Sequence, residues 1–165
     1  MSDLGLLSFY LGIEVKQGKD AITLSQSAYA EKIVIVGRMQ GCNPSLILME
    51  PRFKLSKVSS APVTAYRSIV GSLHYLVHTR PDIAYSVGYV SRFMEAPMTE
   101  HLAAVKRILR YLARTLSYGL CYGKGRKEAA IYLDNDMAGD VDTRKGTSGC
   151  IFFLGSSPIS WYSLK

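Results

Sequence analysis

The spacing of the apolar residues changes from helical to strand-like after Arg126, and this change constrains the fold more than any other feature. From Ala65 the apolar residues recur at helical spacing. They are Tyr66, Ile69, Val70, Leu73, Leu76 and Val77. This spacing predicts one buried helix face. After Arg126 the period falls to two in the runs AAIYLDND, GTSGCIFFLG and PISWYS, which predicts three short antiparallel strands joined by turns.

Prolines divide the helical segment. Pro81 ends the first helix and suits the first turn of a second one. The second helix continues the period with Ile83, Val87, Val90 and Met94. Pro97 is expected to stop it, and Thr99 is expected to cap a third helix, EHLAAVKRILRYLARTL, that ends before Gly119.

The first part of the chain favours strands. Two β-favouring runs, Phe9 to Val15 and Ala21 to Leu24, flank the turn sequence KQGKD and predict a β-hairpin. Ser25 or Ser27 is expected to cap a helix that runs to about Val36. The proline-containing stretch that follows, GCNPSLILMEPRFKLSKVSSAPVT, has no sustained period and predicts an extended connector.

Charge and cysteine usage narrow the class of protein. A net charge of +7 and a pI near 9.4 favour an anionic partner, nucleic acid before a membrane, although many soluble domains are equally basic. The three cysteines are far apart and form no Cys-x-x-Cys pair, which is typical of reduced thiols in an intracellular protein, cytoplasmic or nuclear. The sequence has neither a membrane-length apolar run nor a secretory signal.

The third predicted helix has a basic face. Lys106, Arg107, Arg110 and Arg114 fall within an arc of about 100°. Its apolar residues lie on an arc well away from them. This face is either the solvated side of an ordinary amphipathic helix or a surface that binds phosphates and releases counterions. Three further cations would extend such a surface; they are Lys124, Arg126 and Lys127.

His74 and His78 are four residues apart on a predicted helix, as a zinc pair would be. The sequence between them lacks the glutamate of a zincin helix, and no third ligand is evident, so two half-buried helix histidines are expected. The chain has no Gly-x-Ser-x-Gly and no Gly-Lys-Ser/Thr loop, which argues against hydrolase and nucleotide-loop classes.

Four aspartates gather in one short stretch. They are Asp134, Asp136, Asp140 and Asp142. A calcium loop fits poorly, because its fifth position would be Ala138 and its twelfth Lys145. On a strand, Asp134 and Asp136 would share one face, a workable metal arrangement, but two-metal chemistry needs further carboxylates and none follows between residues 143 and 165. The stretch is therefore part of a metal site or an acidic turn.

Several stretches in this order carry a resemblance to a known family. They are YLGIEVKQGKDAITLSQ, YRSIVGSLHYLVHTRPDIAYSVGYVSRFM, HLAAVKRILRYLARTLSYGL and LDNDMAGDVDTRKGTSGCIFFLGSSPISW. They resemble the Pol polyprotein of copia-type LTR retrotransposons, from late reverse transcriptase into ribonuclease H. The resemblance covers essentially the whole chain. Its most distinctive parts are TRPDIAYSVGYVSRF and DTRKGTSGCIFFLG.

The resemblance implies an α+β chain of three segments. Residues 1–60 would form a late palm-like hairpin, helix and connector that help to seat the primer end. Residues 61–122 would form a thumb- and connection-like helical cluster that holds the template–primer duplex, which favours phosphate binding by the basic helix face. Residues 128–165 would form the first three antiparallel strands of an incomplete RNase H-like sheet.

The same resemblance implies a metal ligand. Asp134 would be the first aspartate that binds Mg²⁺ in the intact family enzyme; Asp136 matches a second family aspartate, to which no catalytic role is given. The chain lacks the polymerase Asp-Asp pair and the later RNase H carboxylates, and one aspartate cannot hold two metal ions. We therefore expect a truncated Pol fragment, catalytically inactive alone and without productively bound Mg²⁺.

Two other hypotheses stay open. The chain could be a stand-alone module that binds RNA–DNA hybrid through the basic helix, or a working RNase H assembled with another chain.

Two structural liabilities also follow from the sequence. The helix in residues 27–36 is unusually apolar and would expose Ile35 or Val36, and a sheet without its covering helix would leave an apolar face and a free edge.

Overall fold

The computed structural model describes residues 5–48, 63–125, 128–136 and 147–164. Its elements, in chain order, are β1 (Phe9–Tyr10), β2 (Ile13–Gln17), β3 (Ala21–Ser25), α1 (Ser27–Val36), α2 (Val63–Leu76), a 3-10 turn η1 (Pro81–Ile83), α3 (Ala84–Ser91), α4 (Thr99–Arg114), β4 (Gly119–Gly123), β5 (Ala129–Asp136), β6 (Thr147–Leu154) and β7 (Ser157–Leu164). This is an α+β fold, as predicted. In the described part of the chain, no helix has the length and apolar character needed to cross a membrane.

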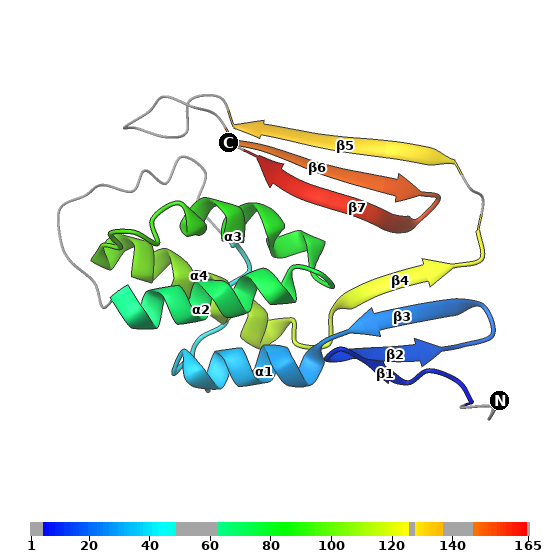
Figure 1. Cartoon of the computed structure of the whole chain (residues 1–165), viewed down its shortest axis with the longest axis horizontal. Coiled ribbons are helices and arrows are strands. Elements are labelled where there is room, and N and C mark those ends of the chain that lie inside the picture. Colours follow the sequence, from blue (N-terminus) through cyan, green and yellow to red (C-terminus); the bar gives the residue numbers. More distant parts are fainter. Residues whose placement is uncertain (1–4, 49–62, 126–127, 137–146, 165) are drawn as a thin grey trace.

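Two antiparallel sheets lie beside a four-helix body (Figure 1). The first sheet has the strand order β1-β2-β3-β4, and the second has the order β5-β6-β7. The sheets approach each other through β4 and β7, and the second sheet packs on the helices mainly through β7 and α3. The three predicted C-terminal strands are confirmed, and so is the hairpin around the turn KQGKD, formed by β2 and β3. The predicted run from Phe9 to Val15 is not one strand, because the chain turns at Leu11 and Gly12 and β1 pairs back on β2.

The strand β4 was not predicted. Its five residues pair with β3 in antiparallel register, from Ser25 opposite Gly119 to Ala21 opposite Gly123. The pairing joins residues about a hundred positions apart, so no local pattern signals it. Gly119 allows the close approach, because a Cβ atom there would collide with the carbonyl oxygen of Leu24.

The helices meet on the apolar faces that their periodicity predicts. The five periodic residues that lie in α2 are all buried; they are Tyr66, Ile69, Val70, Leu73 and Leu76. The sixth, Val77, follows the end of the helix and is half-buried. α4 buries a face that includes Val105, Leu109 and Leu112 in the same core. As expected, α1 leaves apolar side chains in contact with water, with Ile35 45% and Val36 58% exposed.

The predicted helix boundaries need three corrections. Neither Ser25 nor Ser27 caps α1; instead the carboxylate of Glu14, on β2, accepts a hydrogen bond from the Ala28 amide at 3.1 Å. Thr99 is the first residue of α4 and not its cap. Pro97 does not stop α3, which already ends at Ser91. At the start of α1, the capping hydrogen bond is thus accepted by Glu14, which is distant in sequence, so the local sequence could not reveal it.

Candidate functional site

Helix α4 presents the predicted basic face on a buried support. Lys106 and Arg114 are exposed, whereas Arg107 and Arg110 are half-buried. Because the opposite face of α4 is packed in the core, these four side chains project from a helix that is fixed in place. The structure therefore confirms the amphipathic pattern.

Arg110 differs from the other basic residues because it contacts the connector. Its Nε donates a hydrogen bond to the carbonyl oxygen of Asn43 at 2.8 Å, and the amide of Ser45 donates to the carbonyl oxygen of Arg110 at 3.4 Å. Part of its donor capacity is thus used within the chain. Lys106 and Arg114 are the more accessible cations of this face.

The predicted extension of the basic face through Lys124 is wrong. Lys124 follows β4, a five-residue strand that runs away from the helices (Figure 1) and spans about 17 Å at the usual rise per residue. The ammonium of Lys124 donates to the carbonyl oxygen of Lys19 at 2.8 Å, at the hairpin turn. Arg126 and Lys127 lie outside the described residues.

Asp134 lies on β5, at the open edge of the second sheet. Its backbone is opposite Gly149 of β6, which in turn is opposite Ser163 of β7. The structure describes the backbone of residues 134–136 but not their side chains, and Asp140 and Asp142 lie outside the described residues.

The described residues do not form a metal centre around β5. Within that part of the chain, no three His, Cys, Asp or Glu side chains converge. Two-metal phosphodiester chemistry needs several carboxylates, and the described residues alone do not supply them.

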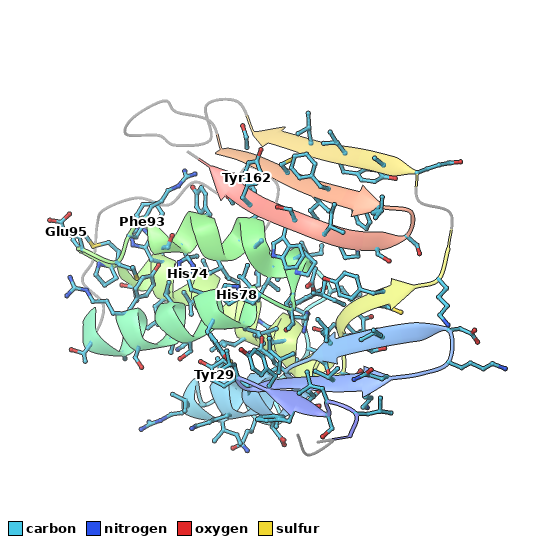
Figure 2. All side chains as sticks on the ribbon, turned by 45° about the vertical axis from the view of Figure 1, so that its right-hand side comes forward. Tyr29, His74, His78, Phe93, Glu95 and Tyr162 are labelled. Atoms are coloured by element: carbon cyan, nitrogen blue, oxygen red, sulfur yellow. The ribbon has the colours of Figure 1, made fainter. Side chains whose placement is uncertain are left out.

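The two histidines are placed differently from the prediction. Both are exposed and not half-buried. α2 ends at Leu76, so His78 lies in the turn after the helix and only His74 is on it (Figure 2). Both line an open groove against β7 that also contains Ser160 and Trp161.

Arg80, which sequence reasoning missed, is a buried polar group with several hydrogen bonds. It is 1% exposed. Its guanidinium donates to both carboxylate oxygens of Asp82, at 2.9 and 2.7 Å, and to the carbonyl and hydroxyl oxygens of Thr115, at 2.8 and 2.7 Å. Tyr111 and Tyr118 place their rings 5.8 and 5.4 Å from it. The distinctive sequence TRPD, which contains Arg80, was the signal from which its importance could have been inferred.

The same motif contacts the first helix. The Thr79 hydroxyl donates to the side-chain carbonyl of Gln26 at 2.9 Å, and both residues are buried. Thr79 and Arg80 thus connect the start of α1, the end of α2 and the end of α4. TRPD is a structural junction that holds the basic helix.

A second buried polar residue, His101, supports the start of α4. Its Nδ1 accepts a hydrogen bond from the Met98 amide at 2.9 Å, and its ring stacks on Phe93 with centroids 3.9 Å apart. The ring is completely buried. Burial lowers the pKa of His101, partly offset by the charge of Glu100, so His101 functions as a neutral acceptor.

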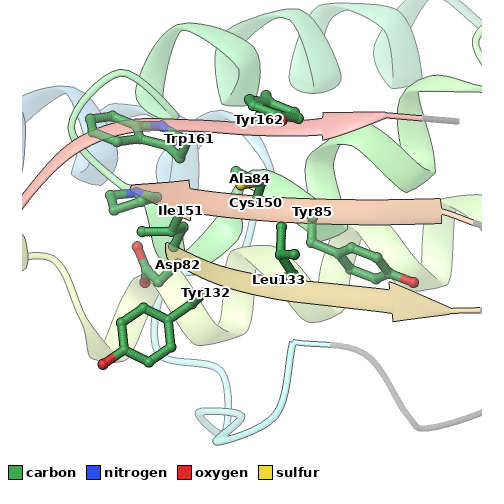
Figure 3. A pocket seen from close by; sticks show the side chains of 11 residues that line it. Asp82, Ala84, Tyr85, Tyr132, Leu133, Cys150, Ile151, Trp161 and Tyr162 are labelled. Carbon is green, nitrogen blue, oxygen red and sulfur yellow. The ribbon is translucent and has the colours of Figure 1, made fainter. Parts of the chain in front are cut away.

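A pocket of about 230 Å³ lies between η1, the start of α3 and the second sheet (Figure 3). Its walls include Asp82, Tyr85, Tyr132 and Trp161. Asp82 already binds Arg80 and also accepts a hydrogen bond from the hydroxyl of Tyr111 at 2.9 Å. The pocket is therefore mainly aromatic and apolar.

Comparison with known proteins places the chain in a family. It is 45% identical over 163 residues to the retrovirus-related Pol polyprotein from transposon RE1 of Arabidopsis thaliana, covering 96% of this chain and 11% of that protein. It is 40% identical over 176 residues to the Pol polyprotein from transposon TNT 1-94 of Nicotiana tabacum, covering 99% and 13%. The chain thus spans about a tenth of the length of these polyproteins.

An uncharacterized mitochondrial protein of Arabidopsis thaliana is similar over most of its own length, with 39% identity over 165 residues that cover 98% of this chain and 68% of that protein. No family model and no solved structure matches the chain. The predicted resemblance is confirmed by these relatives. The chain belongs to the copia-type, retrovirus-related Pol polyproteins of transposons.

Proposed function

We propose that this chain corresponds to the part of Pol that runs from late reverse transcriptase into ribonuclease H, and that it binds RNA–DNA hybrid through helix α4. In this proposal, the helical body is thumb- and connection-like, and β5–β7 are the first strands of an RNase H-like sheet. The chain alone binds but does not cleave. A stand-alone hybrid-binding module would use the same surface.

The observation that carries the proposal is a cationic row on a helix whose opposite face is buried, with Lys106 and Arg114 exposed and Arg110 half-buried between them. Lys106, Arg110 and Arg114 follow one another at four-residue intervals, so the row extends about 12 Å. Measured along the axis of a duplex, that length corresponds to about three phosphate steps of one strand. α4 is held in place by its apolar core and by the contact between Arg80 and Thr115. The helix that carries the row therefore does not have to become ordered when nucleic acid binds.

Asp134 has a separate role in the proposal. It would be the first Mg²⁺ ligand of ribonuclease H in a complete enzyme, where Mg²⁺ activates water and stabilises the leaving oxygen. Hybrid binding would then not depend on Asp134.

The decisive experiment measures hybrid affinity against salt concentration. A short labelled RNA–DNA hybrid is titrated with the wild-type chain and with the double variant Lys106→Ala/Arg114→Ala. Each phosphate contact contributes about 0.9 to the slope of log affinity against log salt, so the double variant should lose about two units of slope. Lys16→Ala is the matched control, since Lys16 is exposed on β2. An affinity that does not change with salt would exclude this proposal.

A further inference from the structure

We propose that the groove between the end of α2 and strand β7 is a second nucleic-acid site, one that binds a single strand. His74 and His78 would contact phosphates, and Tyr75 and Trp161 would stack on bases. This inference rests on the proposed function in that both involve nucleic acid, but it concerns a different surface from the basic face of α4.

The groove is open, with a volume of about 640 Å³. One wall carries His74, Tyr75 and His78, and the other carries Ser160 and Trp161. The groove is large enough for one or two nucleotides, because drug-sized ligands occupy sites of about 300–1,000 Å³. None of the residues that line it is an aspartate or glutamate, so no carboxylate in its walls repels a phosphate.

Trp161 is held in a fixed orientation in this groove. Its indole Nε1 donates a hydrogen bond to the carbonyl oxygen of Val77 at 2.9 Å. Indole has no other polar group, so it offers the groove only ring surface. Trp161 also lines the neighbouring pocket with Tyr85 and Tyr132 (Figure 3). Two adjacent hollows therefore share one aromatic residue, an arrangement that suits a ligand with several flat groups in succession.

Tyr75 is held on the opposite wall. Its ring meets the edge of Tyr29, with centroids 5.1 Å apart, and that of His78, with centroids 5.9 Å apart. Its hydroxyl donates to the carbonyl oxygen of Leu11. Tyr75 is nonetheless 37% exposed. Binding a base would thus require little ordering of the protein.

The chemistry of the walls points to a single strand. Imidazole has an N–H that can donate to a phosphate oxygen whether or not the ring is charged. Aromatic side chains stack on bases of any sequence. In a duplex the base faces are already stacked on one another, so a groove of rings can contact them only in an unpaired strand.

The sole tryptophan of the chain provides a direct measurement. A short oligothymidylate is added to the full chain in buffer with EDTA, and quenching of Trp161 fluorescence is followed. We expect saturable quenching, and an affinity about tenfold lower in His74→Ala/His78→Ala, comparable with the loss of one hydrogen bond to a charged group. Ile22→Ala is the control, because Ile22 is exposed on β3 and is not among the residues that line the groove.

Three results would overturn the inference. They are absent quenching, quenching that both histidine substitutions leave unchanged, and equal competition by inorganic polyphosphate, which has no bases. The α4 double variant separates this inference from the proposed function. If the double variant retains Trp161 quenching but loses hybrid binding, the two surfaces are independent. If the wild-type chain shows quenching but no hybrid binding, only the proposed function fails.

Discussion

The guanidinium of Arg80 forms an ion pair with the carboxylate of Asp82, two residues further along the chain, at 2.7 Å. The arginine side chain is 1% exposed and the aspartate side chain 32% exposed. A buried arginine is tolerated only when its donors are satisfied, and Thr115 at the end of α4 accepts the hydrogen bonds that Asp82 does not. The pair therefore orients the arginine toward the helix that carries the basic face.

Replacing Arg80 should destabilise the fold strongly. Arg80→Ala removes contacts to Thr115 and leaves Asp82 without its cation, and we expect the free energy of unfolding to fall by about 3 kcal/mol. Arg80→Lys should lose about half as much, because an ammonium cannot form the same planar set of bonds. Urea unfolding followed by circular dichroism measures both. Arg38→Ala, at an exposed site, is the control, and a loss below about 1 kcal/mol in Arg80→Ala would contradict the junction.

The protonation of His101 should couple stability to pH. Burial lowers its pKa in the folded chain below the ordinary value of 6.5, so the unfolded chain binds the proton more tightly. The contribution to stability is therefore complete above about pH 6.5 and is lost as the pH falls below it. Urea midpoints between pH 8 and pH 5 measure this loss.

His101→Gln is the matched variant for that measurement. Glutamine can still accept the hydrogen bond from the Met98 amide, but it does not titrate. The variant should be less stable at pH 8 and should lose less stability than the wild type on acidification. An identical pH dependence in both chains would show that another group is responsible.

The alkaline titration of Tyr111 should report on Asp82. Burial, and then the charge and hydrogen bond of Asp82, raise the pKa of Tyr111, while Arg80 lowers it. Asp82→Asn removes the charge and should lower the pKa of Tyr111 without returning it to the ordinary value, because the burial remains. Ultraviolet difference spectra against Tyr111→Phe isolate this residue. A pKa that does not fall in Asp82→Asn would rule out the assigned cause.

Local patterns anticipated the helices and strands where one residue type repeats along a face. The buried face of α2, from Tyr66 to Leu76, follows directly from its spacing. Features made by distant residues were missed. β4 exists because Gly119 fits against Leu24, and Glu14 caps α1 from another strand. Such contacts depend on the folded chain, so no window of sequence contains them.

Side-chain environments were harder to predict than elements. His74 and His78, which were predicted to be half-buried, are exposed, whereas His101 is buried. Arg80 would be placed at the surface by its charge alone, but its partners allow it to be buried. For the candidate site, the basic face could be predicted because it is periodic; the aromatic groove could not, since its walls come from α2 and β7.

Substitutions at two glycines of β4 test how this unpredicted strand is held against β3. Gly119→Ala should destabilise the chain by about 2 kcal/mol, because its Cβ atom would collide with the backbone of Leu24 and force β4 away from β3. Gly123→Ala is the matched control, since a Cβ atom there meets nothing within 4 Å. Thermal or urea unfolding compares the two. Equal losses in both variants would mean that β4 is not held at Gly119.

Asp134→Asn separates binding from catalysis. If the chain alone does not cleave, the wild type should show no Mg²⁺-dependent cleavage of the RNA strand in a labelled hybrid, and Asp134→Asn should bind that hybrid with unchanged affinity. The reason is that a single carboxylate does not hold two metal ions. Cleavage by the wild type that disappears in Asp134→Asn would instead favour a ribonuclease H completed by a second chain. The open edge of β5, where Leu133 is 77% exposed, is the place where that chain would have to pair.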